Sequence, residues 1–335
     1  ADEEWVAAVT KQLGTLQHIS NLYYTEPCAK LAQMLCEKTG MKKVFFGNSG
    51  AEANECAIKA ARKWSEEKKG KEYATIITLK NSFHGRTITT LAATGQDVFH
   101  HDFTPLTEGF VYAEPNDLDE LEQLIKANKC AAVMMEVVQG EGGVMPLDEA
   151  YVKGAAKLCE QYDLLFICDE VQIGNGRSGK LYGYMHYGVQ PDIVSTAKGL
   201  AGGLPLGATL LGARTADVFA AGDHGSTFGG NAACCAGALN ILGRIDDALL
   251  RGVRERSDYI RSALEGADGI LSVSGMGLML GLQVNRPARD FAQTLLEHGV
   301  LVTTAKDRIR LLPALNIPME QLKIAVQQIL RCAAQ

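Results

Sequence analysis

Long apolar runs, clusters of basic residues and paired-cysteine motifs are all missing from this chain. No apolar stretch approaches the roughly 18 residues that a membrane-spanning helix needs. No run of lysine or arginine suggests a nucleic-acid groove, and the formal net charge is −6. The first residues, Ala1 to Glu4, are acidic and polar, which is not typical of a secretory signal peptide. These absences predict a cytoplasmic protein that binds neither membranes nor nucleic acid.

The nine cysteines and seven histidines also lack informative spacings. The cysteines are dispersed and odd in number, without a Cys-x-x-Cys pair, which indicates reduced thiols rather than a disulfide framework. His100 and His101 are adjacent, so their side chains would point in different directions. Because metal coordination needs convergent ligands, we expect no metal site.

What the chain does have is a pattern of alternating helices and strands. Its 335 residues, 47% hydrophobic and 21% charged, are enough for one large and one small domain. The first part favours a mostly parallel sheet flanked by helices, with helices at 27–38, 51–69, 117–127 and 148–162 and strands at 44–46, 74–79, 131–138 and 164–168. After residue 230 we predict a smaller α+β domain, with helices at 232–247, 249–265, 287–298 and 318–332 and strands at 271–273, 278–284, 300–302 and 309–312.

Two charged residues, Asp169 and Lys198, stand directly after short apolar runs. The run at 164–168 leads into Asp169, and Lys198 follows a second run and has a glycine beside it. Sheets of this type bind ligands beyond the carboxyl ends of their strands, so both side chains can point into one crevice. A lysine and an aspartate in one pocket are what pyridoxal phosphate chemistry needs. The amine links covalently to the cofactor, and the carboxylate keeps the pyridine nitrogen protonated.

The stretch from Asp169 to Leu210 resembles the class III pyridoxal-phosphate-dependent aminotransferases, and within them the acetylornithine aminotransferases. The matching text is Asp-Glu-Val-Gln at 169–172, Gly-Asn-Gly-Arg-Ser-Gly-Lys-Leu-Tyr at 174–182, and Pro-Asp-Ile at 191–193 followed by Lys198. The resemblance runs from Gln12 to about residue 330.

This resemblance implies the α/β architecture of the fold type I enzymes. The large domain would hold a mostly parallel, seven-stranded sheet, and a smaller α/β domain would follow it. Residues 20–240 would form the large cofactor-binding domain and residues 241–335 the small C-terminal domain. Residues 1–19 would be the remnant of a longer N-terminal segment.

The segment from Gly47 to Ala53 follows a predicted strand and opens a predicted helix. A helix N-terminus offers free N–H groups and a positive dipole end to an anion. From the residues alone, a plain turn with Ser49 as the helix cap is the favoured explanation of the segment. The resemblance implies that Ser49, Gly50 and Ala51 bind the cofactor phosphate.

Residues around the cofactor ring are implied in the same way. An aromatic side chain such as Phe83 can lie against a planar heterocycle, and Arg86 offers a fork for a carboxylate, although an incidental arginine in a solvated turn is the alternative. The resemblance implies that Phe83 stacks on the ring, Val171 packs on its other face, and Gln172 hydrogen-bonds the ring hydroxyl. It also implies that Arg86 binds the substrate α-carboxylate, and we expect His84 beside Phe83 to be structural.

Glu141 lies among glycines, and Arg310 lies in a predicted strand. Family members that act on the distal amine of ornithine-like substrates use such a glutamate as a switch. It would pair with Arg310 while that amine is bound and release it for glutamate. A surface glutamate and an arginine paired elsewhere remain the alternative.

The glycine-rich segment from Gly225 to Asn231 contains Thr227. The resemblance implies that Thr227 reaches the cofactor phosphate of a neighbouring subunit, which makes the protein a homodimer with shared active sites. A loop that serves only its own chain is the alternative.

The reaction implied is the transfer of the distal amino group of N-acetylornithine to 2-oxoglutarate, giving glutamate, as in arginine biosynthesis. Lys198 would carry the cofactor and move the proton. Succinylornithine, ornithine and 4-aminobutyrate are alternative donors, because enzymes for them share these motifs. Aminomutases or racemases on the same fold, and a catalytically silent homologue, are the remaining alternatives.

Overall fold

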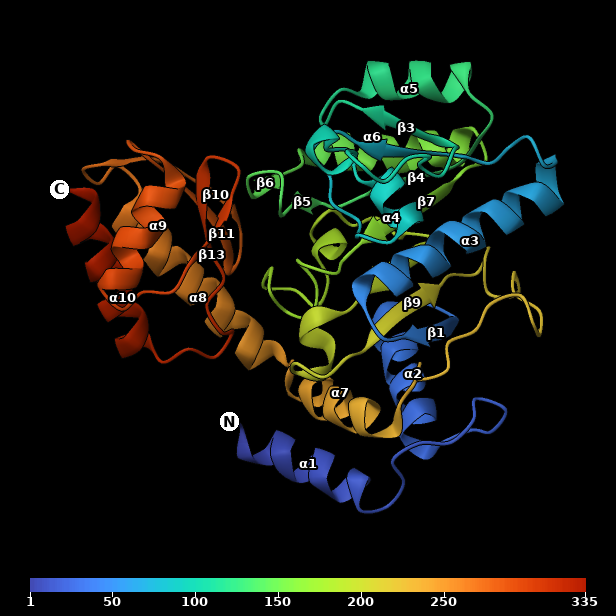
Figure 1. Ribbon diagram of the computed structural model, residues 1–335, viewed down its shortest axis with the longest axis horizontal. Helices are drawn as coiled ribbons and strands as arrows, with labels where there is room; N and C mark the ends of the chain where they lie inside the picture. Colours follow the sequence, from blue (N-terminus) through green and yellow to red (C-terminus); the bar gives the residue numbers. More distant parts are fainter.

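A seven-stranded sheet forms the centre of the larger part of the molecule in the computed structural model, which describes residues 1–335 (Figure 1). The strand order is β1-β9-β8-β7-β4-β2-β3. Strand β9 runs in the opposite direction to the other six strands. The predicted mostly parallel, seven-stranded sheet is therefore confirmed. The strands are β1 (Lys43–Gly47), β2 (Thr75–Leu79), β3 (Phe110–Ala113), β4 (Cys130–Met135), β7 (Leu165–Asp169), β8 (Ile193–Thr196) and β9 (Gly207–Leu211).

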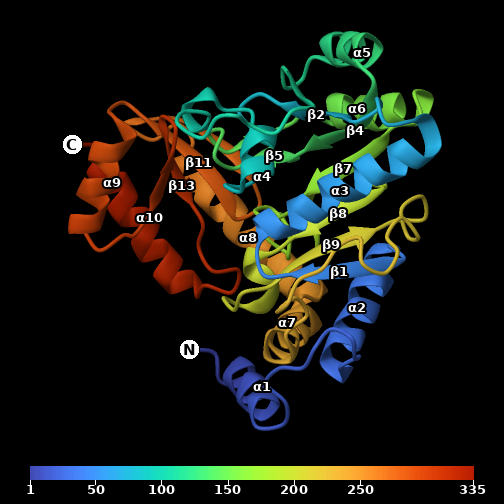
Figure 2. The same cartoon turned by 45° about the vertical axis from the view of Figure 1, so that its right-hand side comes forward.

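Helices cover both faces of this sheet, which is why its central strands are nearly continuous apolar runs. All residues of β4 and β7 are buried. Because side chains alternate along a strand, Ala132 and Met134 face α3 (Gly50–Lys69), whereas Val133 and Met135 face the opposite helices. Figure 2 shows α3 lying across one face of β7, β8 and β9. The other helices of this part are α1 (Glu3–Leu13), α2 (Glu26–Thr39), α4 (Ile88–Ala93), α5 (Leu118–Ala127), α6 (Glu149–Gln161) and α7 (Ala232–Arg244).

A second, smaller sheet lies in the C-terminal part. Its four strands are antiparallel in the order β10-β11-β13-β12. Eighteen buried residues, all between Val253 and Ala333, form a separate apolar core there. Its elements are α8 (Asp247–Leu264), β10 (Ile270–Met276), β11 (Met279–Val284), α9 (Ala288–Glu297), β12 (Thr303–Ala305), β13 (Arg308–Leu311) and α10 (Met319–Ala333).

The two parts meet beside the short ribbon of β5 (Val138–Gln139) and β6 (Met145–Pro146), which contacts β10. Figure 1 shows this ribbon between the two sheets. The domain limits 1–19, 20–240 and 241–335 stay a prediction, and they would place a boundary inside α7. No helix of the structure is long and apolar enough to cross a membrane.

Two strand predictions differ from the structure. The strand predicted at 131–138 ends at Met135, because the Glu136 carboxylate accepts hydrogen bonds from Phe83 N and Gly140 N at a bend. The strand predicted at 300–302 is wrong. Val300 N donates to Leu295 O at the end of α9, and the extended pairing starts only at Thr303. Helices α1 and α4 and strands β3, β5, β6, β9 and β12 were not predicted, and β8 was noted only as an apolar run before Lys198.

Candidate active site

A cavity of about 910 Å³ opens at the boundary between the two parts. Five predicted site residues line it: Val171, Gln172, Lys198, Glu141 and Arg310. The wall is completed by side chains from α1, α7 and the segment after β13, among them Trp5, Arg244 and Asn316. The other predicted site residues do not line this cavity: Ser49, Gly50, Ala51, Phe83, Arg86, Asp169 and Thr227. Among them, Asp169 is buried.

Lys198 comes directly after β8, where the chain turns from a strand into the helical turn η3 (Lys198–Ala201). Its φ of 47° lies in the left-handed region, which L-residues with a side chain rarely adopt. Burial lowers the pKa of its amine, although the nearby carboxylates Asp169, Glu136 and Glu141 act in the opposite direction. A lowered pKa leaves more of the amine neutral, and the neutral form is the nucleophile.

Asp169 ends β7, next to β8, and its register partner is Ser195. Its carboxylate is almost fully buried, at 4% exposure. Oδ2 accepts from Asn54 Nδ2 at 2.7 Å and lies 2.8 Å from His84 Nδ1, while Oδ1 accepts from Val171 N at 3.0 Å. Three contacts therefore fix the orientation of this carboxylate, and His84 is one of them.

Glu136 is a second buried carboxyl group that the sequence pattern did not single out as a site residue. It directly follows β4, the parallel neighbour of β7, so it occupies the same sheet edge as Asp169. Burial raises its pKa to about 7, His84 lowers it, and Asp169 raises it further. The available clue was its place at the end of a predicted buried strand.

Ser49 caps α3, and its Oγ accepts from Glu52 N at 3.2 Å. Gly50 and Ala51 form the first turn, where backbone N–H groups lack partners within the helix. The loop is packed closely: a side chain at Gly50 would meet Val171 at 2.6 Å, and one at Gly207 would meet Ser49 O at 2.1 Å. The N-terminus of α3 is thus packed against Val171, one of the residues that line the cavity.

Phe83 and Arg86 stand beside one another near Phe99. The Arg86 guanidinium lies 5.7 Å from the centre of the Phe83 ring and 5.0 Å from that of Phe99. Arg86 is exposed and makes no ion pair, so its charge is available to a ligand. Its predicted role as carboxylate-binding residue stays a prediction, as does the stacking role of Phe83.

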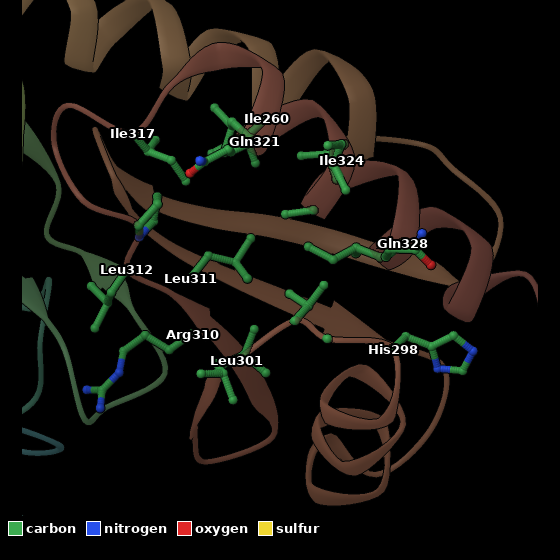
Figure 3. Close-up of a pocket in the computed structure, with 18 of the residues that line it drawn as sticks. Ile260, His298, Leu301, Arg310, Leu311, Leu312, Ile317, Gln321, Ile324 and Gln328 are labelled. Carbon is green, nitrogen blue, oxygen red and sulfur yellow. The ribbon is translucent and has the colours of Figure 1, made fainter.

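Glu141 and Arg310 are in contact across the two parts of the molecule. Arg310 Nη1 donates to Glu141 Oε1 at 2.7 Å and to Gln172 Oε1 at 3.2 Å. Beside α10 lies an apolar groove whose lining includes Leu301, Leu311 and Ile324. Figure 3 shows the Arg310 side chain extending away from this groove. Gln172 Nε2 is buried and has no hydrogen-bond partner in the protein.

Thr227 lies in an exposed loop, and its hydroxyl has no hydrogen-bond partner within the chain. Its predicted contact with a neighbouring subunit therefore stays a prediction.

A lysine, a buried aspartate and a helix N-terminus lie at one edge of a mostly parallel sheet, as the fold type I, pyridoxal-phosphate-dependent enzymes require. The family model described as "Aminotransferase class-III" matches residues 1–333. The chain belongs to this family.

Relatives with curated names and solved structures agree with this assignment. The chain is 49% identical over 328 residues to the acetylornithine aminotransferase of Haemophilus ducreyi, covering 97% of this chain and 84% of that protein. It is 43% identical over 325 residues to the succinylornithine transaminase of Salmonella newport, covering 94% of this chain and 79% of that protein. The ornithine aminotransferase structure from Toxoplasma gondii ME49 superposes with a TM-score of 0.94 at 32% identity, covering 99% of this chain and 82% of that one.

Proposed function

We propose that this transaminase moves the distal amino group of N-acetylornithine to 2-oxoglutarate, giving N-acetylglutamate 5-semialdehyde and glutamate. The observation that carries the proposal is the 2.7 Å contact between Arg310 and Glu141. A distal-amine donor brings no carboxylate to this arginine, so the guanidinium needs an internal partner. Glutamate brings its own carboxylate and must displace Glu141.

The residues present fit pyridoxal phosphate. Gln172 Nε2 is a buried donor without a partner, as expected for a group that waits for a ligand acceptor. The closely packed helix start at Ser49, Gly50 and Ala51 suits a phosphate. Phe83 and Val171 would hold the two ring faces, and Thr227 of a second subunit would complete the phosphate site.

When bound, the cofactor supplies an electron sink that stabilises negative charge on the substrate carbon. Asp169 would face the pyridine nitrogen, because its carboxylate is held in one orientation by Asn54 and Val171 N. Lys198 Nζ is the covalent attachment point, and its lowered pKa suits it to take and return the proton at the reacting carbon. Arg86 binds the carboxylate at the far end of the substrate.

N-succinylornithine is a second candidate donor. Arg177 and Arg244 line the same cavity, and Arg177 has no carboxylate partner. A guanidinium without a counter-ion at the cavity wall suits an acyl group that ends in a carboxylate.

We also propose a homodimer in the cytoplasm, with the domain limits at 20–240 and 241–335. The homodimer follows from the expected role of Thr227 in a shared site. All nine cysteines are free thiols, which fits a reducing compartment.

The first experiment is a visible absorption spectrum of the cofactor-loaded protein before and after N-acetylornithine is added without a keto acid. We expect the absorbance of the lysine-linked cofactor to fall as the amino group is transferred. N-succinylornithine, ornithine and 4-aminobutyrate are compared in the same assay, with Lys198→Ala as the control that should show no such absorbance. No response to any of the four amines would contradict the proposal, and consumption of 2-oxoglutarate separates a transaminase from an aminomutase.

A further inference from the structure

Asn175 connects the loop after β7 to the peptide that carries Lys198. It lies between two glycines in a tight turn, has a φ of 56°, and is 5% exposed. Its Nδ2 donates to Thr196 Oγ1 at 3.0 Å and to Ala197 O at 3.0 Å. Ala197 immediately precedes Lys198, so one side-chain amide fixes the peptide from which the lysine projects.

This peptide needs such support. Strand β8 ends at Thr196, and η3 begins at Lys198, so the chain changes direction within two residues. Lys198 adopts a left-handed conformation there. A residue held in this region persists only when its surroundings fix it. Hydrogen bonds from Asn175 to the two preceding residues provide that restraint.

The other end of the same amide is unsatisfied. A carbonyl oxygen can only accept, so the atom facing Ala197 O must be the Nδ2 group, and the orientation of the amide is determined. Oδ1 therefore lies on the other side, where it is buried and has no partner. Asn175 lines the cavity together with Lys198. Oδ1 is covered by the protein, so the amide is held only through the two hydrogen bonds that Nδ2 donates.

We propose that Asn175 is a positioning residue for Lys198, acting through the Ala197 carbonyl that its Nδ2 holds. The inference rests on the proposed attachment of the cofactor to Lys198.

The side chain can be removed without straining the backbone at position 175 itself. Glycine accepts the φ of 56° there, so Asn175→Gly deletes both hydrogen bonds of the amide with little local strain. Asn175→Asp tolerates the same conformation and keeps an acceptor, but it cannot donate to Ala197 O. The matched control is Asn116→Gly, because Asn116 has a φ of 68° in a turn between β3 and α5 and does not line the cavity.

The first measurement is the rate at which cofactor-free protein captures pyridoxal phosphate, followed by visible absorbance over a range of pH. Rates are compared at the high-pH plateau, where the lysine amine is neutral in every variant. We expect capture to slow by about tenfold or more in both Asn175 variants, because the amine is misplaced, and to stay unchanged in Asn116→Gly.

The second measurement is the denaturant unfolding of each variant, which shows whether slower capture reflects a misplaced lysine or a loss of stability. Unchanged capture in both Asn175 variants, or equally slowed capture in Asn116→Gly, would overturn the proposal. If the unmodified chain captures no cofactor, the proposed function itself fails, and this outcome differs from an effect confined to the variants. If Asn175→Gly does not fold, the capture rate of Asn175→Asp decides.

Discussion

Arg310 Nη1 lies 2.7 Å from Glu141 Oε1, and this ion pair joins β13 of the C-terminal sheet to the turn between β5 and β6. Arg310 also donates to Gln172, which lies three residues after the end of β7 that carries Asp169. One guanidinium therefore connects the small sheet, the β5–β6 ribbon and the end of the large sheet. Any ligand that competes for Arg310 changes contacts in both parts of the molecule.

Replacing Glu141 with glutamine should shift the preference between the two substrates of the reaction. The uncharged side chain no longer neutralises Arg310, so we expect glutamate to bind about five- to tenfold more tightly and the kcat/KM for N-acetylornithine to fall relative to that for glutamate. Half-reaction kinetics with each amine alone measure this ratio. The control is Glu160→Gln, because Glu160 is an exposed residue of α6. An unchanged ratio would contradict the switch.

Replacing Asp169 with asparagine should remove the charge and keep the size of the side chain. The single amide oxygen cannot accept from both Asn54 Nδ2 and Val171 N, so one of these contacts is also lost. We expect kcat to fall by about 10²-fold or more, because a fixed charge at the cofactor nitrogen is lost from a buried site. Steady-state kinetics test this, with cofactor occupancy measured in parallel. Activity within a factor of two of the original at full occupancy would exclude the role given to Asp169.

Glu136 should make the folded protein less stable as the pH rises. Burial raises its pKa from 4.5 to about 7, so the folded state holds a proton that the unfolded chain releases. The associated stability is fully present below pH 4.5 and is lost as the pH rises toward 7. Glu136→Gln is uncharged like the protonated group and can keep the bond from Phe83 N, although its NH2 group cannot accept from Gly140 N. We expect the variant to gain roughly 1 to 3 kcal/mol relative to the original between pH 5 and pH 8. Denaturant unfolding at both pH values tests this, and a difference that does not vary with pH would count against it.

Two glycine-to-alanine changes should differ in their effect on cofactor affinity. A side chain at Gly207 would meet Ser49 O at 2.1 Å, so Gly207→Ala must displace the loop that starts α3. We expect cofactor affinity to fall by about tenfold or more, as measured by equilibrium dialysis. A side chain at Gly243 in α7 would meet nothing within 4 Å. Gly243→Ala should leave cofactor affinity unchanged and stabilise the helix by about 0.5 to 1 kcal/mol. Equal affinities for the two variants would contradict this account of the loop.

The sequence predicted the buried strands and the two residues at their ends better than it predicted the contacts around them. Asp169 and Lys198 were visible because each follows an apolar run, and parallel pairing of β7 with β8 brings those runs together. Strand β9 was not visible, because it begins with glycine and is inserted antiparallel between two strands that follow the common direction.

The contacts around the site depend on register and on backbone conformation. Glu136 comes close to Asp169 only because β4 pairs with β7, and this pairing cannot be predicted from the residues next to Glu136. Asn175 matters because its turn is left-handed, and its sequence neighbours do not reveal which carbonyl the amide will reach. Leu301, at 83% exposure, shows that an apolar residue in a β-branched run need not be in a strand.

The separate core of the C-terminal part has a consequence for heating. Its eighteen buried side chains form a cluster distinct from the 41-residue cluster, which belongs mainly to the larger part and includes only Met279 and Ala305 from the small sheet. Either core can melt while the other keeps its apolar contacts, so a single all-or-none transition is not required. In the ligand-free protein, calorimetric enthalpy should exceed the van't Hoff enthalpy. A ligand that bridges Arg310 and the β7 end should merge the two transitions into one.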